Sequence, residues 1–341
     1  MHPNQKDTDH LEIVEIRSQN GLRCKLTNLG CRVMELHVPD RNGKLTDVVL
    51  GFDYPQEYLR DPETFFGAFV GRVANRISNA AFALDGKKYE LTKNHGKHHI
   101  HGGDKGLHRV VWTITEKTDS EVTFSYRSPD GEEGYPGNLD LKVTYKLSDE
   151  KGLEILYEAQ SDQPTPINLT NHSYFNLNGA GNESIENHTF QIRASSFLPT
   201  DKEQIPTGEI RSVENTPFDL RKVQKIGPLL TMKNEQIEIA KGFDHHFIAD
   251  GDGMRLQAEA MSPLTGIRMQ VWSDQPGLQF FCGGAMKEPL KGKGGKTYGP
   301  KAAFCLETQG YPNSVNQPRF PTIFIEPGIK YKTTTRYKFS T

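Results

Sequence analysis

Residues 139–147, LDLKVTYKL, alternate strictly between two kinds of side chain. The odd-numbered positions are Leu, Val or Tyr, and the even-numbered positions are Asp, Lys or Thr. Successive side chains of a β-strand point to opposite faces, so this run predicts a strand with one face in a core. Residues 266–272 and 331–339 alternate too, with partly polar inner faces. This period of two dominates the chain and favours sheets over helices.

Further runs with strand composition are separated by turn residues at short intervals. They cover residues 11–18, 22–29, 32–39, 45–51, 110–117, 121–127, 153–160, 189–194, 254–261, 278–282 and 303–308. In residues 82–91, the dipeptide Asp85-Gly86 lies between two short runs and predicts a hairpin. Helical spacing is limited to residues 55–60 and 226–240. The sequence therefore predicts an all-β fold, a large antiparallel β-sandwich with few short helices.

The length of 341 residues is enough for one large domain with a substantial core. No linker, charge block or low-complexity run divides the chain. We therefore expect a single domain over residues 1–341, in which the polar residues 1–10 form a flexible N-terminal segment.

The charge balance, 41 basic against 43 acidic residues, gives no electrostatic footprint for nucleic acid or an anionic membrane. No apolar run approaches the roughly 18–20 residues that span a bilayer, and the N-terminus lacks the apolar core of a signal peptide. The four cysteines have no CxxC spacing, so we expect reduced and mostly buried thiols. We expect a soluble cytoplasmic protein, unless a leader peptide has been removed.

Residues 168–177, NLTNHSYFNL, place His172 inside a run of strand composition. Asn171, Ser173 and Tyr174 flank it, and such neighbours can hold an imidazole in one tautomer and orientation. An acid/base histidine needs that. The alternative is a structural histidine with satisfied hydrogen bonds.

The run AFCLETQ, residues 303–309, contains Glu307. Within a strand, Phe304 and Leu306 face one side while Cys305 and Glu307 face the other. Burying an unpaired carboxylate is costly, so a glutamate on a mostly apolar strand indicates a function. A raised pKa would suit Glu307 to act as a base near neutral pH.

Residues 95–103, HGKHHIHGG, contain four histidines. The spacing His99-x-His101 is similar to a cupin metal motif, but no Glu follows within the required distance, so we predict no metal site. Gly102 and Gly103 indicate that the backbone approaches a neighbour closely just after His101. A neutral His101 that donates a hydrogen bond to a ligand oxygen fits this position.

Polar side chains suited to hydroxyl groups occur in two other motifs. Asn75 and Arg76, in GRVANRISNA (71–80), provide several donors, with a surface salt bridge as the alternative. Asp244, in GFDHHF (242–247), could accept two sugar hydroxyls or form an Asx-turn. Gln279 places an amide beside aromatic rings, a combination found in polyol sites and also in ordinary cores.

Residues 289–299, LKGKGGKTYGP, resemble a phosphate-binding loop only superficially. The GxxxxGK[ST] pattern would need Gly at position 290, which is Leu290, and no helical pattern follows. We therefore predict a flexible surface loop here.

As a set, the motifs resemble the aldose 1-epimerases, also called galactose mutarotases. The resemblance rests on GRVANRI, HGG, SPDGEEGYPG, PINLTNHSYFNL, PFDLR, GFDHHF, SDQPGLQFF and CLETQGYPNSVNQPRFP, in the order and spacing of that family. It extends from about residue 10 to the C-terminus, and no catalytic position departs from the family pattern.

The resemblance implies an enzyme that interconverts the α- and β-anomers of free hexoses such as D-galactose and D-glucose. It implies that His172 protonates the ring oxygen as general acid and that Glu307 deprotonates the anomeric hydroxyl as general base. It implies a sugar pocket formed by Asn75, Arg76, His101, Tyr174, Asp244 and Gln279, with no metal and no organic cofactor. We further expect a bell-shaped pH profile, no nucleic-acid or membrane partner, and a monomer or weak homodimer.

Three other functions are compatible with parts of the sequence. A hexose 6-phosphate as substrate would need a basic cluster, for which Arg72 and Arg221 are candidates. A glycosidase needs two carboxylates that flank the scissile bond, and only Glu307 and Asp244 are available. A sugar-binding module would use the pocket residues but would not need both an acid and a base.

Overall fold

The computed structural model describes residues 10–60, 65–282 and 289–341. Within these ranges there are three short α-helices: α1 (Glu57–Arg60), α2 (Ile226–Leu229) and α3 (Glu235–Ala240). The helix predicted over 226–240 is two helices, because the side chain of Asn234 caps a new N-terminus by accepting from the backbone N–H of Gln236. The predicted flexible segment 1–10 lies outside the described residues, apart from His10.

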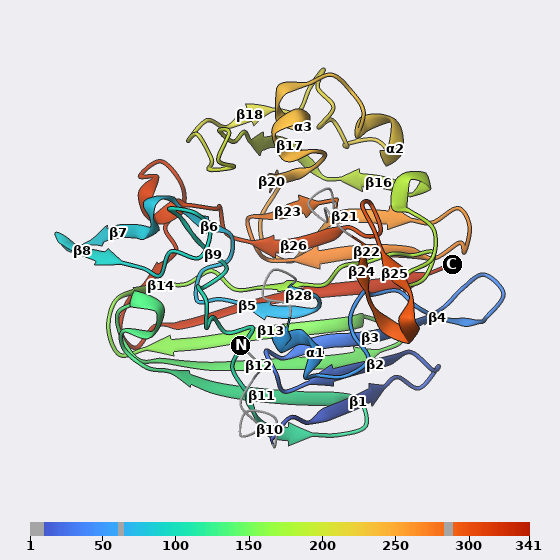
Figure 1. Cartoon of the computed structure of the whole chain (residues 1–341), viewed down its shortest axis with the longest axis horizontal. Coiled ribbons are helices and arrows are strands. Elements are labelled where there is room, and N and C mark those ends of the chain that lie inside the picture. The colour runs from blue at the N-terminus through green and yellow to red at the C-terminus, as the bar shows by residue number, and fades with distance from the viewer. Residues whose placement is uncertain (1–9, 61–64, 283–288) are drawn as a thin grey trace.

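The largest sheet of the described chain has nine antiparallel strands that run across the molecule (Figure 1). Their order is β10 (Thr113–Lys117), β11 (Glu121–Ser128), β12 (Leu139–Ser148), β13 (Gly152–Ser161), β28 (Lys330–Ser340), β22 (Arg268–Ser273), β21 (Arg255–Met261), β16 (Thr189–Ile192) and β19 (Gln224–Lys225). The alternation over 139–147 is confirmed, because the odd-numbered side chains of β12 are buried. The polar inner face predicted near the C-terminus is confirmed too, since Thr333 and Thr335 of β28 are buried.

Two smaller antiparallel sheets face the nine-stranded sheet. In the described chain, one has four strands in the order β1 (Ile13–Arg17), β2 (Arg23–Thr27), β3 (Arg32–Pro39) and β4 (Leu45–Asp47). The other has five strands in the order β18 (Arg211–Ser212), β17 (Ala194–Leu198), β20 (Asp244–Ala249), β23 (Gly277–Phe281) and β26 (Cys305–Gln309).

Short strand pairs complete the described structure. They are β5 (Ala68–Val70) with β15 (Thr170–His172), β6 (Arg76–Ile77) with β9 (His99–Ile100), β7 (Ala81–Leu84) with β8 (Lys87–Glu90), β14 (Thr165–Pro166) with β27 (Phe324–Ile325), and β24 (Leu290–Lys291) with β25 (Thr297–Tyr298). The hairpin predicted around Asp85-Gly86 is confirmed by β7 and β8, and both turn residues have positive φ. Short 3-10 turns lie at Ser78–Ala80, Glu132–Gly134, Ile185–Asn187, Lys293–Gly295 and Ser314–Asn316.

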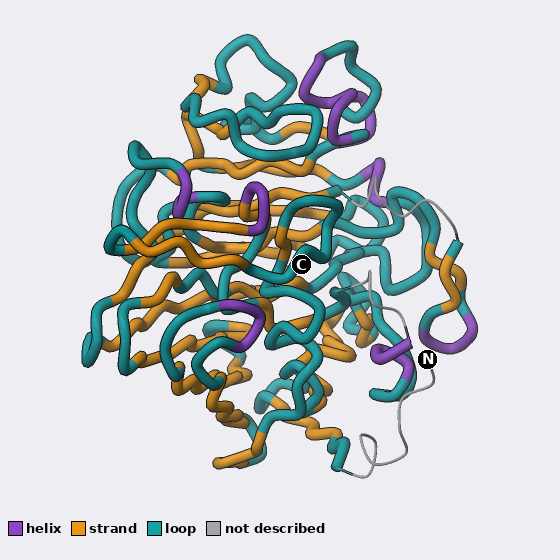
Figure 2. Tube along the Cα trace, turned by 60° about the vertical axis from the view of Figure 1, so that its left-hand side comes forward, coloured by secondary structure: helices purple, strands orange, loops and turns teal. Residues whose placement is uncertain are grey.

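The main core lies between the nine-stranded sheet and the two smaller sheets. The hydroxyl of Tyr145 on β12 donates to the carbonyl of Cys31, next to β3. At the other end, Tyr337 on β28 donates to the carbonyl of Leu306 on β26. These bonds join layers whose facing side chains form one hydrophobic cluster. The predicted β-sandwich is therefore confirmed, and Figure 2 shows how little of the trace is helical.

The strand β26 has one face toward the core and one face away from it, as predicted. Leu306 belongs to the main core and Thr308 hydrogen-bonds Thr335 of β28. Cys305 and Glu307 therefore point to the other side of the five-stranded sheet. This outward face, covered by the loops that contain β5, β6, β9 and β15, carries the polar residues described below.

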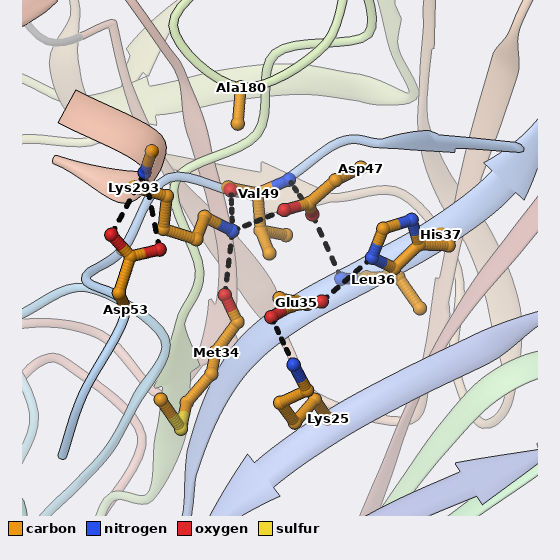
Figure 3. Close-up of polar contacts among 12 residues, drawn as sticks. Lys25, Met34, Glu35, Leu36, His37, Asp47, Val49, Asp53, Ala180 and Lys293 are labelled. Atoms are coloured by element: carbon orange, nitrogen blue, oxygen red, sulfur yellow. Dashed lines mark hydrogen bonds and ion pairs between the residues drawn. The ribbon is translucent and has the colours of Figure 1, made fainter. Parts of the chain in front are cut away.

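The predicted flexible surface loop over 289–299 is wrong at its centre, because Lys293 is buried. Its ammonium group donates to the carbonyls of Met34 and Val49 and pairs with the carboxylate of Asp47 (Figure 3). The sequence pattern did not indicate this, since a lysine among glycines looks solvent-exposed. The buried contacts tie the β24–β25 hairpin to the four-stranded sheet.

All four cysteines are buried thiols, as expected. Among the described residues, no helix has the length and apolar composition that crossing a membrane requires.

Candidate active site

His172 ends the short strand β15, which pairs with β5 and contacts β26. Its imidazole stacks on the ring of Tyr174 at a centroid distance of 4.9 Å, with 21° between the planes. The ring of Phe65 is also stacked on it, at 5.7 Å and 25°. These two aromatic rings restrict the orientation of an imidazole that is only 5% exposed.

Glu307 on β26 lies next to His172. The Nε2 atom of His172 is 3.5 Å from Oε1 of Glu307, and the glutamate is 2% exposed. The other oxygen, Oε2, has no hydrogen-bond partner among the described residues. On the far side of the imidazole, Nδ1 is 3.5 Å from the Sγ atom of Cys305. Glu307 therefore keeps one oxygen that a ligand could use.

Burial shifts the two groups toward their neutral forms. Desolvation lowers the pKa of His172 from its ordinary value of 6.5 to about 4. Desolvation, and next the negative charge of Asp244, raise the pKa of Glu307 well above its ordinary value. Without ligand, the pair therefore holds its exchangeable proton on Glu307. Transfer of that proton to His172 turns Glu307 into a carboxylate and His172 into an imidazolium, and the pair still holds the same number of protons.

His101 faces the same site and is held by its backbone neighbours. Its Nδ1 atom accepts a hydrogen bond from the backbone N–H of Asn75 at 3.2 Å, so the neutral ring carries its proton on Nε2. Burial, and next the charge of His172, keep the pKa of His101 well below its ordinary value. A side chain at Gly102 would approach the carbonyl oxygen of Gly71 to 1.8 Å, which explains the glycine. The neutral His101 ring therefore has an N–H at Nε2 that is available to donate.

The predicted hydroxyl-binding residues converge on Asp244. Gln279 donates to its Oδ1 atom at 2.6 Å, and the Nη1 atom of Arg76 is 3.6 Å from Oδ2. Asn75 has a positive φ of 64° and accepts from the backbone N–H of Arg76 through Oδ1. Cross-strand register places these residues on one face, because Gln279 lies opposite both Glu307 on β26 and His246 on β20, and Asp244 is two residues from His246 on the same strand. The structure thus brings every predicted pocket residue to one face of the five-stranded sheet.

Three neighbours of this site were not predicted from the sequence. Phe65 stacks on His172, Cys305 contacts its Nδ1 atom, and Gln204 bridges Arg76 and Asp244. Alternation in CLETQ placed Cys305 on the face of Glu307, which was a usable signal. Phe65 and Gln204 lie in stretches without a motif, and only the fold brings them here.

The two arginines considered for a phosphate group lie elsewhere. The guanidinium of Arg72 is buried and donates to the carbonyls of Ser128, Pro129, Pro136 and Gly137. Arg221 forms a bidentate pair with Asp219 and lines a separate hollow of about 710 Å³ with Arg193 and Trp272. Neither is available to a phosphate bound beside Glu307.

A metal ion is the alternative occupant. One donor atom each of His101, His172 and Glu307 lie within 4.8 Å of one another. His101 does not fit, because its Nδ1 lone pair is used by Asn75 and its Nε2 therefore carries a proton. The pair His99-x-His101 does not fit either, since Thr92 and Tyr135 occupy both ring nitrogens of His99.

Comparisons with known proteins identify the family of this chain. The sequence model of the aldose 1-epimerases matches residues 12–338. The galactose mutarotase of Bos taurus is 47% identical over 320 residues, which cover 94% of this chain and 91% of that protein. The aldose 1-epimerase of Escherichia coli (strain K12) is 34% identical over 337 residues, 98% of this chain and 96% of that protein.

Solved structures agree with these sequence matches. An aldose epimerase homologue from C. elegans superposes with a TM-score of 0.90 at 32% identity, covering 97% of this chain and 99% of that one. The galactose 1-epimerase of Lactobacillus acidophilus gives a TM-score of 0.85 at 29% identity, covering 100% of this chain and 97% of that one.

Proposed function

This chain belongs to the aldose 1-epimerase family, and from that premise we propose that His172 and Glu307 interconvert the anomers of free hexoses by general acid/base catalysis. It is a carbohydrate isomerase that interconverts sugar anomers. The substrates that we propose are D-galactose and D-glucose. The 3.5 Å contact between His172 and Glu307 is the observation that carries the assignment of the two roles.

The reaction needs one proton delivered and one proton removed. Glu307 takes the proton of the C1 hydroxyl while His172 delivers a proton to the ring oxygen, and the C1–O5 bond breaks to give the open aldehyde. The C1–C2 bond then rotates and the ring closes on the other face of the carbonyl, with the two roles reversed. Each positioned group contributes on the order of 10²–10⁴-fold to the rate.

Because His172 and Glu307 are both neutral without ligand, substrate binding must change their protonation. Glu307 must be ionised and His172 protonated when the ring opens, so the shared proton moves from carboxyl to imidazole as the sugar binds. The unpartnered Oε2 of Glu307 is the atom that we assign to the C1 hydroxyl. The sugar hydroxyl then supplies the hydrogen bond that stabilises the carboxylate.

The remaining polar residues hold the sugar. His101 offers a neutral N–H donor, which binds an oxygen without competing for the catalytic proton. Asp244 and Arg76 provide carboxylate oxygens and guanidinium N–H groups for hydroxyls, and Gln279 fixes the orientation of Asp244. Asn75 supports His101 through its backbone, and Tyr174 supports His172 through its ring.

Polarimetry on freshly dissolved α-D-galactose tests the proposal. Wild type should bring the rotation rapidly to its equilibrium value, and Glu307→Gln should slow this by about 10²–10⁴-fold. Glu326→Gln, a change at an exposed glutamate, should behave like wild type and is the control. If wild type is no faster than buffer on galactose or glucose, the free-hexose proposal fails and hexose phosphates are the next substrates to test.

We also propose that the chain works as one domain, as a cytoplasmic monomer or weak homodimer. The buried thiols support a reducing compartment. Gel filtration across protein concentrations tests the oligomeric state, and a dimer that persists at nanomolar concentration would contradict it.

A further inference from the structure

The loop of residues 199–207, between β17 and β18, reaches the polar cluster around Asp244. Its Gln204 side chain accepts from the Nη2 atom of Arg76 at 2.7 Å and donates to Oδ2 of Asp244 at 3.3 Å. The amide orientation is fixed by charge, because the oxygen faces a cation and the nitrogen faces a carboxylate. Gln204 therefore lies between the two charged residues of the sugar pocket.

The backbone holds Gln204 in a conformation that serves this contact. Its φ is 60°, in the left-handed region that non-glycine residues rarely adopt. Asp201 stabilises the turn by accepting, through Oδ1, from the backbone N–H groups of Glu203 and Ile205. The side chain of Gln236 bonds both backbone groups of Thr200, which anchors the loop to α3. The strained residue is thus supported from both sides.

A second contact joins this loop to the opposite wall of the site. The carboxylate of Glu203 is 2.8 Å from the ammonium of Lys97 and 3.6 Å from the Nε2 atom of His98. Both partners belong to the histidine-rich segment that continues into His101. The loop therefore spans from the five-stranded sheet to the segment that carries the His101 donor.

The hydrogen-bonding capacity of Gln204 is only half used. An amide has two N–H donors and two oxygen lone pairs. The bonds to Arg76 and Asp244 leave one donor and one lone pair among the described contacts. Gln204 is half-buried, so these groups lie at the rim of the site. A hydroxyl, which donates and accepts at once, matches what is left.

The position of Gln204 indicates which part of a sugar it meets. Asp244 is on β20 and Glu307 on β26, with β23 between them, and two strand spacings place their backbones about 10 Å apart. A hexose whose C1 lies at Glu307 and His172 therefore directs its far hydroxyls toward Asp244 and Gln204.

We propose that Gln204 is a sugar-binding residue that determines specificity, because it contacts a hydroxyl on the ring carbons remote from C1. This rests on the proposed function, since it places the anomeric carbon at Glu307. Galactose and glucose differ only in the configuration at C4, one of those remote carbons. Loss of the Gln204 amide changes the preference between these two sugars.

Two variants remove the amide of Gln204 and differ in what else they change. Gln204→Gly removes the amide and tolerates the positive φ, whereas Gln204→Leu removes the amide but keeps a side chain of similar length. Lys202→Ala, at an exposed position of the same loop, is the matched control. Initial mutarotation rates on galactose and glucose give kcat and KM, and thermal unfolding reports on the fold.

We expect kcat/KM of both Gln204 variants to fall about five- to tenfold on the preferred sugar, the usual effect of losing one hydrogen bond to a neutral hydroxyl. The loss should lie mostly in KM, and the galactose-to-glucose ratio of kcat/KM should change at least about fivefold. Lys202→Ala should match wild type. Variants within twofold of wild type would overturn the proposal, and so would equal losses on both sugars, since these indicate a role confined to holding Arg76 and Asp244.

Calorimetric titration of each sugar separates this proposal from the proposed function. If wild type binds both sugars but does not accelerate mutarotation, the proposed function fails and the affinities of the same variants still decide the role of Gln204. If wild type binds neither sugar, both proposals are overturned.

Discussion

The Nε2 atom of His172 lies 3.5 Å from Oε1 of Glu307, although the two residues belong to separate sheets. His172 comes from the short β15 strand and Glu307 from the edge strand of the five-stranded sheet. Burial opposes a charge on either group, so the contact holds a single exchangeable proton between two neutral partners. An enzyme that must protonate one oxygen and deprotonate another can use such a pair in both directions.

The first prediction concerns the pH dependence of activity. At neutral pH the pair holds one exchangeable proton. As pH falls, His172 binds another one near its lowered pKa of about 4, and Glu307 can no longer act as a base. As pH rises, the pair loses its last proton from Glu307, whose pKa lies well above the ordinary carboxyl value. We therefore expect kcat/KM, measured by polarimetry, to follow a bell-shaped curve with its acid limb near pH 4. A profile without an alkaline limb would contradict the assignment of Glu307.

The second prediction concerns acid stability. Burial lowers the pKa of several histidines, and the group comprises His99, His101, His108, His172, His188, His245 and His246. Between about pH 6.5 and 4 the unfolded chain binds protons that the folded protein does not, so stability is complete above this window and is lost as pH falls through it. Each such histidine lowers the free energy of unfolding by up to about 1.4 kcal/mol per pH unit.

Urea unfolding at pH 7.5, 6 and 5 measures this dependence. His246 is the informative position, because both ring nitrogens lack a hydrogen-bond partner among the described residues and its pKa is lowered to about 3. In His246→Leu, the free energy of unfolding should fall less steeply with decreasing pH, because one histidine fewer takes up a proton on unfolding. An unchanged slope in this variant would show that His246 does not contribute.

The third prediction concerns the buried lysine of the β24–β25 hairpin. Lys293→Ala leaves the partly buried Asp47 carboxylate without its cation, and losing a charge-assisted hydrogen bond of this kind costs about 1.5–3 kcal/mol of unfolding free energy. Lys291→Ala, at an exposed position of the same hairpin, should change stability by less than about 0.5 kcal/mol. Equal stability of the two variants in denaturant titrations would refute a stabilising role of Lys293.

The fourth prediction concerns metal ions. Because Nδ1 of His101 accepts from Asn75, its Nε2 carries a proton and cannot ligate a metal together with His172 and Glu307. Dialysis against EDTA should therefore leave kcat/KM within about twofold of the starting value, in line with acid/base chemistry by side chains alone. Activity that disappears on dialysis and returns with added Zn²⁺ would overturn this interpretation.

Where side chains alternate over several residues, the sequence predicted both the strand and which of its faces is buried. The period of two in residues 139–147 corresponds to β12, and the run 32–39 coincides with β3. The strand β20 was not predicted, because Asp244, His245 and His246 do not look like strand residues. They form one because β17 and β23 pair with β20 on both sides, and pairing over such distances leaves no local pattern.

Some site residues could be found from the local sequence, and others only from the fold. Glu307 could be found because a carboxylate on an apolar strand is locally anomalous, and the other pocket residues lie in motifs of the family. Lys293 and Gln204 could not be found, because each looks like an ordinary residue of a polar loop. Their partners, Asp47 and Asp244, are distant in sequence and reach them only in the folded chain.

The sequence alone determined the strand-rich architecture and the family, because side-chain alternation and motif spacing are local properties that a linear chain displays. The tertiary structure decided which acid and base lie side by side, which cation is buried, and which loop reaches Arg76 and Asp244. These depend on sheet register and on distances of a few ångströms between remote segments, and on the desolvation that burial imposes. The contact between His172 and Glu307 exists only because β15 is packed against β26.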